Sequence, residues 1–146
     1  MIYHFDQSLI WHVVFHPGRS LWGRKYRHVS LAGYSDTNWL HIDLHRRAVS
    51  CAMIFRHDEV EDYLSYLLTH YTVLRFGPAR PSKGVLLRPM SCVSFAKHTL
   101  GVQSGALRPD SLLRDLCRDP NVQVLNDALS PPRNTATSVP ASSGPA

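Results

Sequence analysis

The chain has 146 residues, a formal net charge of +5 and a hydrophobic content of 44%. That length allows one domain with a modest core and excludes two domains of ordinary size. No apolar run is long enough to span a membrane, and the first residues lack the features of a signal peptide, so we expect no membrane span and a cytoplasmic location. The positive charge is scattered, without a basic stripe interleaved with aromatic residues, so nucleic acid is not an expected partner.

Four strands are predicted in the first part of the chain, where β-branched and aromatic residues are frequent. The third of them alternates most regularly, which places its polar residues on one face of the sheet. That face carries Trp39, His41, Asp43 and His45. The four predicted strands cover residues 9–16, 26–32, 39–45 and 49–55.

The periodicity becomes helical at residues 58–68, where apolar side chains recur every three or four positions and acidic residues crowd the first turn. We expect one α+β domain over residues 1–128, with an antiparallel sheet of about four to six strands and three helices packed on it. Residues 129–146 are rich in Ser, Pro, Ala and Thr and are expected to form a disordered tail. The remaining predicted elements are strands at 71–76 and 85–87 and helices at 92–100 and 109–117.

The three cysteines form no CxxC pair, which argues against a disulfide framework and against a cysteine-based zinc site. Cys51 and Cys117 are expected to be small buried side chains. Cys92 differs from both, because Pro89 precedes it and a helix-like apolar pattern follows it. Unpaired N–H groups and the helix dipole favour a thiolate at a helix N-terminus, so Cys92 is the candidate nucleophile.

A thiol nucleophile needs a base, and the base needs an orienting partner. His28 lies in the middle of a predicted strand, where its imidazole can be held rigidly. The connection to the next strand is short, so the two strands are expected to pair antiparallel. His41 and Asp43 share a face of that next strand, and either one could bond the His28 imidazole.

A histidine on a strand, a polar residue on the next strand and a cysteine opening a helix form an order that resembles a known family. These are the circularly permuted papain-like peptidases and acyltransferases, related to NlpC-type peptidases and to lecithin:retinol acyltransferase. The resemblance implies a permuted papain-like fold with Cys92 as nucleophile, His28 as base and His41 as third member. Small phage-encoded proteins are also similar, in a motif that falls here on Cys92, Val93, Lys97, Leu100, Gly101, Pro109 and Leu112.

The function expected from these residues is cysteine-based hydrolysis or acyl transfer at an amide, ester or thioester bond, without a cofactor. A peptide, peptidoglycan or an acyl chain would be the substrate, and the host cytoplasm or a virion the location of a phage-encoded chain. Two alternatives stay open. The fold could serve a non-catalytic phage-type accessory protein that binds a protein partner. Alternatively, His41, Asp43 and His45 could hold a divalent metal ion for a hydrolase.

Overall fold

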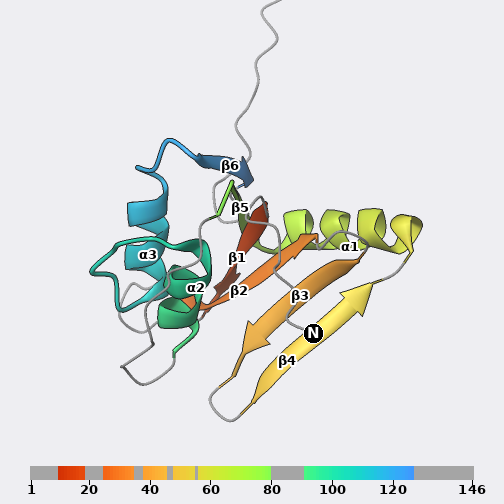
Figure 1. Ribbon diagram of the computed structural model, residues 1–146, viewed down its shortest axis with the longest axis horizontal. Helices are drawn as coiled ribbons and strands as arrows, with labels where there is room; N and C mark the ends of the chain where they lie inside the picture. The colour runs from red at the N-terminus through yellow and green to blue at the C-terminus, as the bar shows by residue number, and fades with distance from the viewer. Residues whose placement is uncertain are drawn as a thin grey trace, which may run out of the picture.

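The computed structural model describes residues 10–18, 25–34, 38–45, 48–54, 56–79 and 91–126. These residues form a six-stranded antiparallel sheet and three helices, which confirms the predicted α+β class (Figure 1). The strand predicted at 85–87 and the tail predicted at 129–146 lie outside the described residues.

The strands and helices follow the predicted ones closely, with shifts of one or two residues at most of their ends. One strand near the end of the described chain was not predicted, and it is labelled β6. The elements are β1 (Trp11–Pro17), β2 (Tyr26–Tyr34), β3 (Trp39–Leu44), β4 (Val49–Ile54), α1 (His57–His70), β5 (Thr72–Phe76), α2 (Cys92–Leu100), α3 (Pro109–Leu116) and β6 (Val122–Asn126).

Strand β1 lies near the middle of the sheet, whose order is β4-β3-β2-β1-β5-β6. The first four strands form a meander in which each strand pairs with the next. After α1 the chain returns to the free edge of β1, where β5 pairs with it from Trp11–Phe76 to Phe15–Thr72. Strand β6 then covers the outer edge of β5. The antiparallel pairing predicted for the strands that carry His28 and His41 is therefore confirmed.

Both faces of the sheet are covered by helices, and alternation along β1 shows how. Val13 and Phe15 belong to a buried cluster with residues of α2 and α3, such as Ala96 and Leu112. Val14 points to the opposite face and packs in a second cluster, with Val60 and Leu67 of α1. Figure 1 shows α1 on one side of the sheet and α2 with α3 on the other. None of the helices in the described ranges is long and apolar enough to cross a membrane.

Hydrogen bonds fasten α2 to α3 through the segment that joins them. The Lys97 ammonium donates to the carbonyl oxygens of Ser104 and Ala106, at 2.8 Å and 2.9 Å. The Ser104 hydroxyl in turn donates to the Asp115 carboxylate of α3, at 2.5 Å. Helix α2 ends at Leu100, and Gly101, which caps it, has a φ of 70°, a left-handed conformation that glycine adopts without steric cost. The two helices on this face are thereby held as one unit.

The burial predicted for two of the cysteines is wrong. Cys51 is exposed because β4 is an edge strand, and its residues from Val49 to Met53 are all exposed. Cys117 is also exposed, just after the last residue of α3. An apolar run in the sequence therefore indicated a strand correctly at β4 but not the burial of that strand.

Candidate active site

Cys92 is the first residue of α2, as predicted, and two serines fix the start of that helix. The Ser91 hydroxyl accepts the Ser94 N–H at 3.1 Å, and the Ser94 hydroxyl accepts the Ser91 N–H at 2.8 Å. This reciprocal capping satisfies two N–H groups that the helix itself leaves without acceptors. The sulfur of Cys92 therefore starts from a well-defined backbone position.

His28 and Asp43 are brought together by the pairing of β2 with β3. The register pairs Leu31 with Ile42, so the next position along places Asp43 beside Ser30, two residues from His28 and on the same face of the sheet. The His28 Nε2 atom and the Asp43 Oδ1 atom form a short hydrogen bond. Both side chains are shielded, with 19% and 18% of their surfaces exposed. Asp43, and not His41, is therefore the residue that contacts the imidazole.

The Cys92 thiol reaches the same imidazole from the start of α2. Its sulfur hydrogen-bonds the His28 side chain, and it also accepts the backbone N–H groups of Val29 and Val93. The pairing of β2 with β3 runs from Tyr34 only as far as Leu31, so Val29 lies beyond the last pair. Helix α2 thus places its first residue against the part of β2 that β3 no longer covers. The structure therefore joins Cys92, His28 and Asp43 in one chain of contacts.

Opposite pKa shifts follow from this contact. The hydrogen bond to Cys92 raises the pKa of His28; burial opposes the rise, and Asp43 adds to it. Burial would raise the pKa of the Cys92 thiol, but its hydrogen bonds from His28 and from the Val29 N–H outweigh burial and lower it. Both shifts favour a thiolate beside an imidazolium, which is the reactive form of a cysteine nucleophile.

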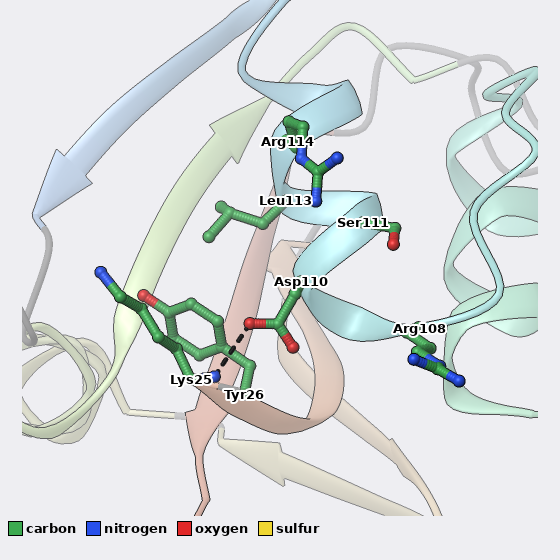
Figure 2. A pocket seen from close by; sticks show the side chains of 7 residues that line it. All are labelled: Lys25, Tyr26, Arg108, Asp110, Ser111, Leu113 and Arg114. Carbon is green, nitrogen blue, oxygen red and sulfur yellow. Dashed lines mark hydrogen bonds between the residues drawn. The ribbon is translucent and has the colours of Figure 1, made fainter. Parts of the chain in front are cut away.

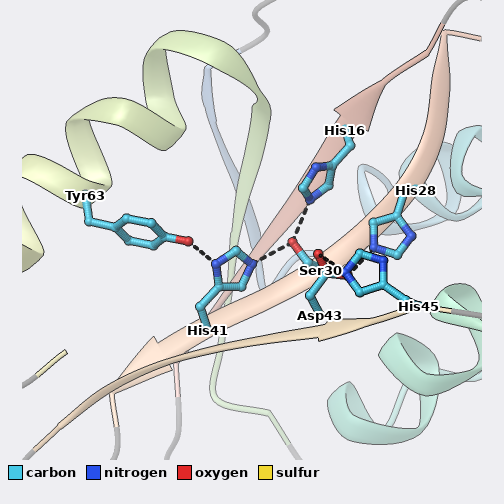
Figure 3. Close-up of polar contacts among 7 residues, drawn as sticks. All are labelled: His16, His28, Ser30, His41, Asp43, His45 and Tyr63. Carbon is cyan, nitrogen blue, oxygen red and sulfur yellow. Dashed lines mark hydrogen bonds and ion pairs between the residues drawn. The ribbon is translucent and has the colours of Figure 1, made fainter. Parts of the chain in front are cut away.

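His41 belongs to a second group on the same face of the sheet. Its Nδ1 atom contacts the Tyr63 hydroxyl of α1, and its Nε2 atom lies 2.9 Å from the Ser30 hydroxyl. The same hydroxyl lies 2.7 Å from Nε2 of His16. Figure 3 shows this group beside His28, with Asp43 between His28 and Ser30. His41 therefore does not contact the His28 imidazole, which was one of its two predicted roles.

In this second group, the pKa shifts favour the neutral forms of the side chains. Burial lowers the pKa of His16 to about 4, helped by the nearby His28. Burial also lowers the pKa of His41, although Asp43 opposes the change. The pKa of Tyr63 is raised to about 12, again mainly by burial. This group is therefore neutral near pH 7.

His45 and His16 complete the surroundings of His28. The His45 ring stacks on the His28 ring with centroids 5.6 Å apart, and its Nε2 atom lies 3.4 Å from Oδ2 of Asp43. His16 faces His28 across the β1–β2 pair, with ring centroids 5.1 Å apart. The sequence placed His16 on one strand face with His12, in support of metal binding, but did not connect it with His28. The signal that could have found it is its place in a hairpin with His28, since residues opposite each other in a hairpin share a face.

The expected metal ligands are only partly brought together. Asp43 and His45 are neighbours, but His41 turns toward Ser30 and Tyr63. In the part of the chain that the structure describes, the group of possible metal ligands whose atoms all lie within 4.8 Å consists of His16, His28 and Asp43.

A hollow of about 420 Å³ lies between the start of β2 and α3, and none of the three residues Cys92, His28 and Asp43 lines it. At its base the Lys25 backbone N–H donates to the Asp110 carboxylate at 3.0 Å (Figure 2). Three basic side chains surround this one acid. The hollow is lined by Lys25, Tyr26, Arg108, Asp110, Ser111, Leu113 and Arg114.

No protein-family model, curated protein or solved structure matches the chain. The likeness to permuted papain-like enzymes therefore stays a prediction from the sequence. The chemistry open to this site follows from the contacts of its own side chains.

Proposed function

We propose that the protein is a hydrolase or acyltransferase that uses Cys92 as its nucleophile, His28 as general base and acid, and Asp43 as the residue that orients His28. One observation carries this proposal: the His28 side chain bonds both the Cys92 thiol and the Asp43 carboxylate. A base held between a nucleophile and a carboxylate is the arrangement that nucleophilic acyl transfer requires.

The first half of the reaction forms an acyl-enzyme. His28 takes the proton of the Cys92 thiol, and the thiolate sulfur attacks the carbonyl carbon of the substrate. The resulting oxyanion collapses, the bond to the leaving group breaks, and His28 gives its proton to that group. The backbone N–H of Cys92 lies at the start of α2, where it can stabilise the oxyanion.

The second half releases the acyl group. His28 takes a proton from a water molecule or from an acceptor hydroxyl or amine, whose oxygen or nitrogen attacks the thioester carbonyl. The bond from carbon to the Cys92 sulfur then breaks, and His28 returns its proton to the thiolate or keeps it in the ion pair. Asp43 engages Nε2 of His28, which leaves Nδ1 of the same ring for these proton transfers.

The substrate class is an acyl compound with an amide, ester or thioester bond. A peptide, peptidoglycan or a lipid acyl chain would supply such a bond. We keep the cytoplasm, or a virion assembled there, as the proposed location. A thiol nucleophile needs no metal or organic cofactor for this chemistry, so none is part of the proposal.

The pH dependence of thiol alkylation tests the Cys92–His28 pair directly. Iodoacetamide labelling is followed for each cysteine by mass spectrometry, in the wild type and in His28→Ala. We expect Cys92 to react with an apparent pKa below about 8.5, the value of an ordinary thiol, and the variant to lose this shift. Cys51 and Cys117 are exposed and serve as internal controls. If Cys92 is labelled at pH 6 no faster than these two cysteines, the proposal is wrong.

Turnover of p-nitrophenyl acetate tests the chemistry beyond the ionisation. The expected result is a burst of nitrophenol followed by steady hydrolysis, with a thioester on Cys92 detectable by mass spectrometry. Cys92→Ala should abolish both, and Cys51→Ala is the matched control that should leave them unchanged. Acylation of Cys51 in place of Cys92 would contradict the assignment.

A further inference from the structure

His16 is a shielded histidine that the proposed reaction does not use. It comes from β1, directly opposite His28 of β2, and its ring lies 5.1 Å from the His28 ring. Its Nε2 atom lies 2.7 Å from the Ser30 hydroxyl, which fixes the ring in place. A second imidazole held this close to the catalytic base calls for a chemical reason.

Two imidazoles and a carboxylate meet at this point. One ligand atom from each of His16, His28 and Asp43 lies within 4.8 Å of the other two. The three residues come from three neighbouring strands, β1, β2 and β3, so the sheet itself holds them. We propose that these three side chains form a binding site for Zn²⁺ that competes with the Cys92–His28 pair.

The geometry suits a zinc ion with three protein ligands. Zinc lies about 2.0–2.2 Å from imidazole nitrogen and carboxylate oxygen, so neighbouring ligand atoms in a tetrahedral site are roughly 3.3 Å apart. Small rotations of the side chains bring atoms within 4.8 Å to that spacing. The fourth position is left for water, and His45, 3.4 Å from Oδ2 of Asp43, helps to orient the carboxylate.

Binding of the ion changes the partners of His28. The ion takes the place of the proton between His28 and Asp43, and that proton passes to the buffer. The imidazole that stabilised the Cys92 thiolate then has a metal ion on one nitrogen and is drawn toward β1. Cys92 therefore loses part of its activation while the ion is bound. The loss of activation rests on the proposed function, whereas the binding of Zn²⁺ does not.

Calorimetric titration of the full chain with zinc sulfate at pH 7, in a buffer that does not chelate metals, tests the site. We expect one Zn²⁺ to bind in the wild type and the affinity to fall at least tenfold in His16→Gln, which can keep a hydrogen bond to Ser30. His70→Gln is the matched control, because His70 is an exposed histidine on α1. Its affinity should equal that of the wild type.

Two further variants keep the result interpretable. Asp43→Asn removes the carboxylate with little change of shape, so it should also weaken Zn²⁺ binding at least tenfold. This variant tests the site if His16→Gln fails to fold. Cys92→Ala should bind Zn²⁺ at least as tightly as the wild type, because the thiol is not a ligand and its removal frees His28 from the competing pair. No binding, equal binding by wild type and His16→Gln, or loss of binding in Cys92→Ala alone would each overturn the proposed site.

Labelling of Cys92 at pH 7 separates this inference from the function on which it partly rests. Zn²⁺ should slow iodoacetamide labelling of Cys92 several-fold in the wild type, and EDTA should restore the rate. In His16→Gln, Zn²⁺ should not change the labelling rate relative to that variant's own metal-free rate. A wild type that binds Zn²⁺ but whose Cys92 is never activated would refute the function and leave the metal site standing. Activated Cys92 without Zn²⁺ binding would do the reverse.

Discussion

Two groups of histidines lie side by side on one face of the sheet, and their pKa values shift in opposite directions. His28 contacts the Cys92 thiol and the Asp43 carboxylate, and its pKa is raised. His41 contacts the hydroxyls of Ser30 and Tyr63, and burial lowers its pKa. Both imidazoles are partly buried, so burial alone does not explain the difference.

The difference is explained by the partners. A thiolate or a carboxylate stabilises an imidazolium, whereas a hydroxyl bonds a neutral imidazole equally well and leaves desolvation to decide. The surroundings of His28 thus favour its protonated form, and those of His41 favour the neutral form. Removing a partner should therefore lower the reactivity of Cys92 in the group of His28, and the stability of the fold in the group of His41.

Asp43→Asn should have the largest effect, because it removes the carboxylate from the reactive group. We expect the steady hydrolysis of p-nitrophenyl acetate to fall about 100-fold in kcat/KM, equivalent to about 2.7 kcal/mol. Asp58→Asn, at an exposed acid of α1, is the control and should leave hydrolysis unchanged. Equal activity of Asp43→Asn and the wild type would remove Asp43 from the reaction.

Low pH should destabilise the folded protein through protonation of His16. Its pKa is about 4 in the folded protein and about 6.5 when unfolded, so between these values the unfolded chain binds more protons and stability rises with pH. When the pH is lowered from 7 to 4.5 in EDTA, the free energy of unfolding should fall by about 2 kcal/mol more in the wild type than in His16→Gln. The groups around this ring, His28, His41, Asp43 and Arg27, are present in both proteins.

Urea unfolding at each pH measures this difference. His28 acts in the opposite sense, because its raised pKa contributes stability that is lost as pH rises through that pKa, above about 6.5. The window below pH 6.5 therefore isolates the histidines with lowered pKa values. Parallel pH profiles for wild type and His16→Gln would show that His16 is not held neutral by burial.

Ser30→Ala should lower the unfolding free energy by about 1.5 kcal/mol, because the imidazoles of His16 and His41 lose their shared partner. The labelling rate of Cys92 should stay within about twofold of the wild type, since the hydrogen bonds of the Ser30 hydroxyl go to His16 and His41. Ser65→Ala, at an exposed position of α1, is the control for stability. A large fall in Cys92 labelling would show that the two groups act as one.

Tyr63→Phe should have the smallest effect, a loss of about 1 kcal/mol of unfolding free energy, because one hydroxyl bond to His41 disappears while the ring still packs. Tyr66→Phe is the matched control, since its hydroxyl makes a long, exposed contact of 3.3 Å with Tyr71. Both variants are compared by urea unfolding at pH 7. Equal stability of the two variants would mean that the bond from Tyr63 contributes nothing.

Periodicity in the sequence predicted most of the fold, because the sheet and helices are amphipathic in the ordinary way. Strand β6 escaped prediction since its five residues, Val122–Asn126, are mostly exposed and show no regular alternation. It pairs with the outer edge of β5, a long-range contact that a local sequence pattern does not show. Cys51 was misjudged for a related reason: a sequence does not show which strand will lie at the edge of a sheet.

The sequence predicts the candidate site except for one choice, the partner of His28, which depends on the register between two strands. Cys92 was placed at a helix start and His28 on a strand, and both placements are confirmed. His41 and Asp43 share a face, so alternation could not decide between them as partners of His28. The register places His41 opposite Ala32 and brings Asp43 two positions closer to His28.

The order of the strands has a consequence for the newly made chain. Strands β1 to β4 pair with their neighbours in sequence, whereas β5 must return past α1 to reach β1, which closes a long loop at a larger cost in chain entropy. Cys92 follows all five of these strands in the chain, and its helix α2 packs against residues of β1 and β2. We therefore expect a nascent chain to carry an ordinary thiol, and the reactive one to arise as a late product of folding.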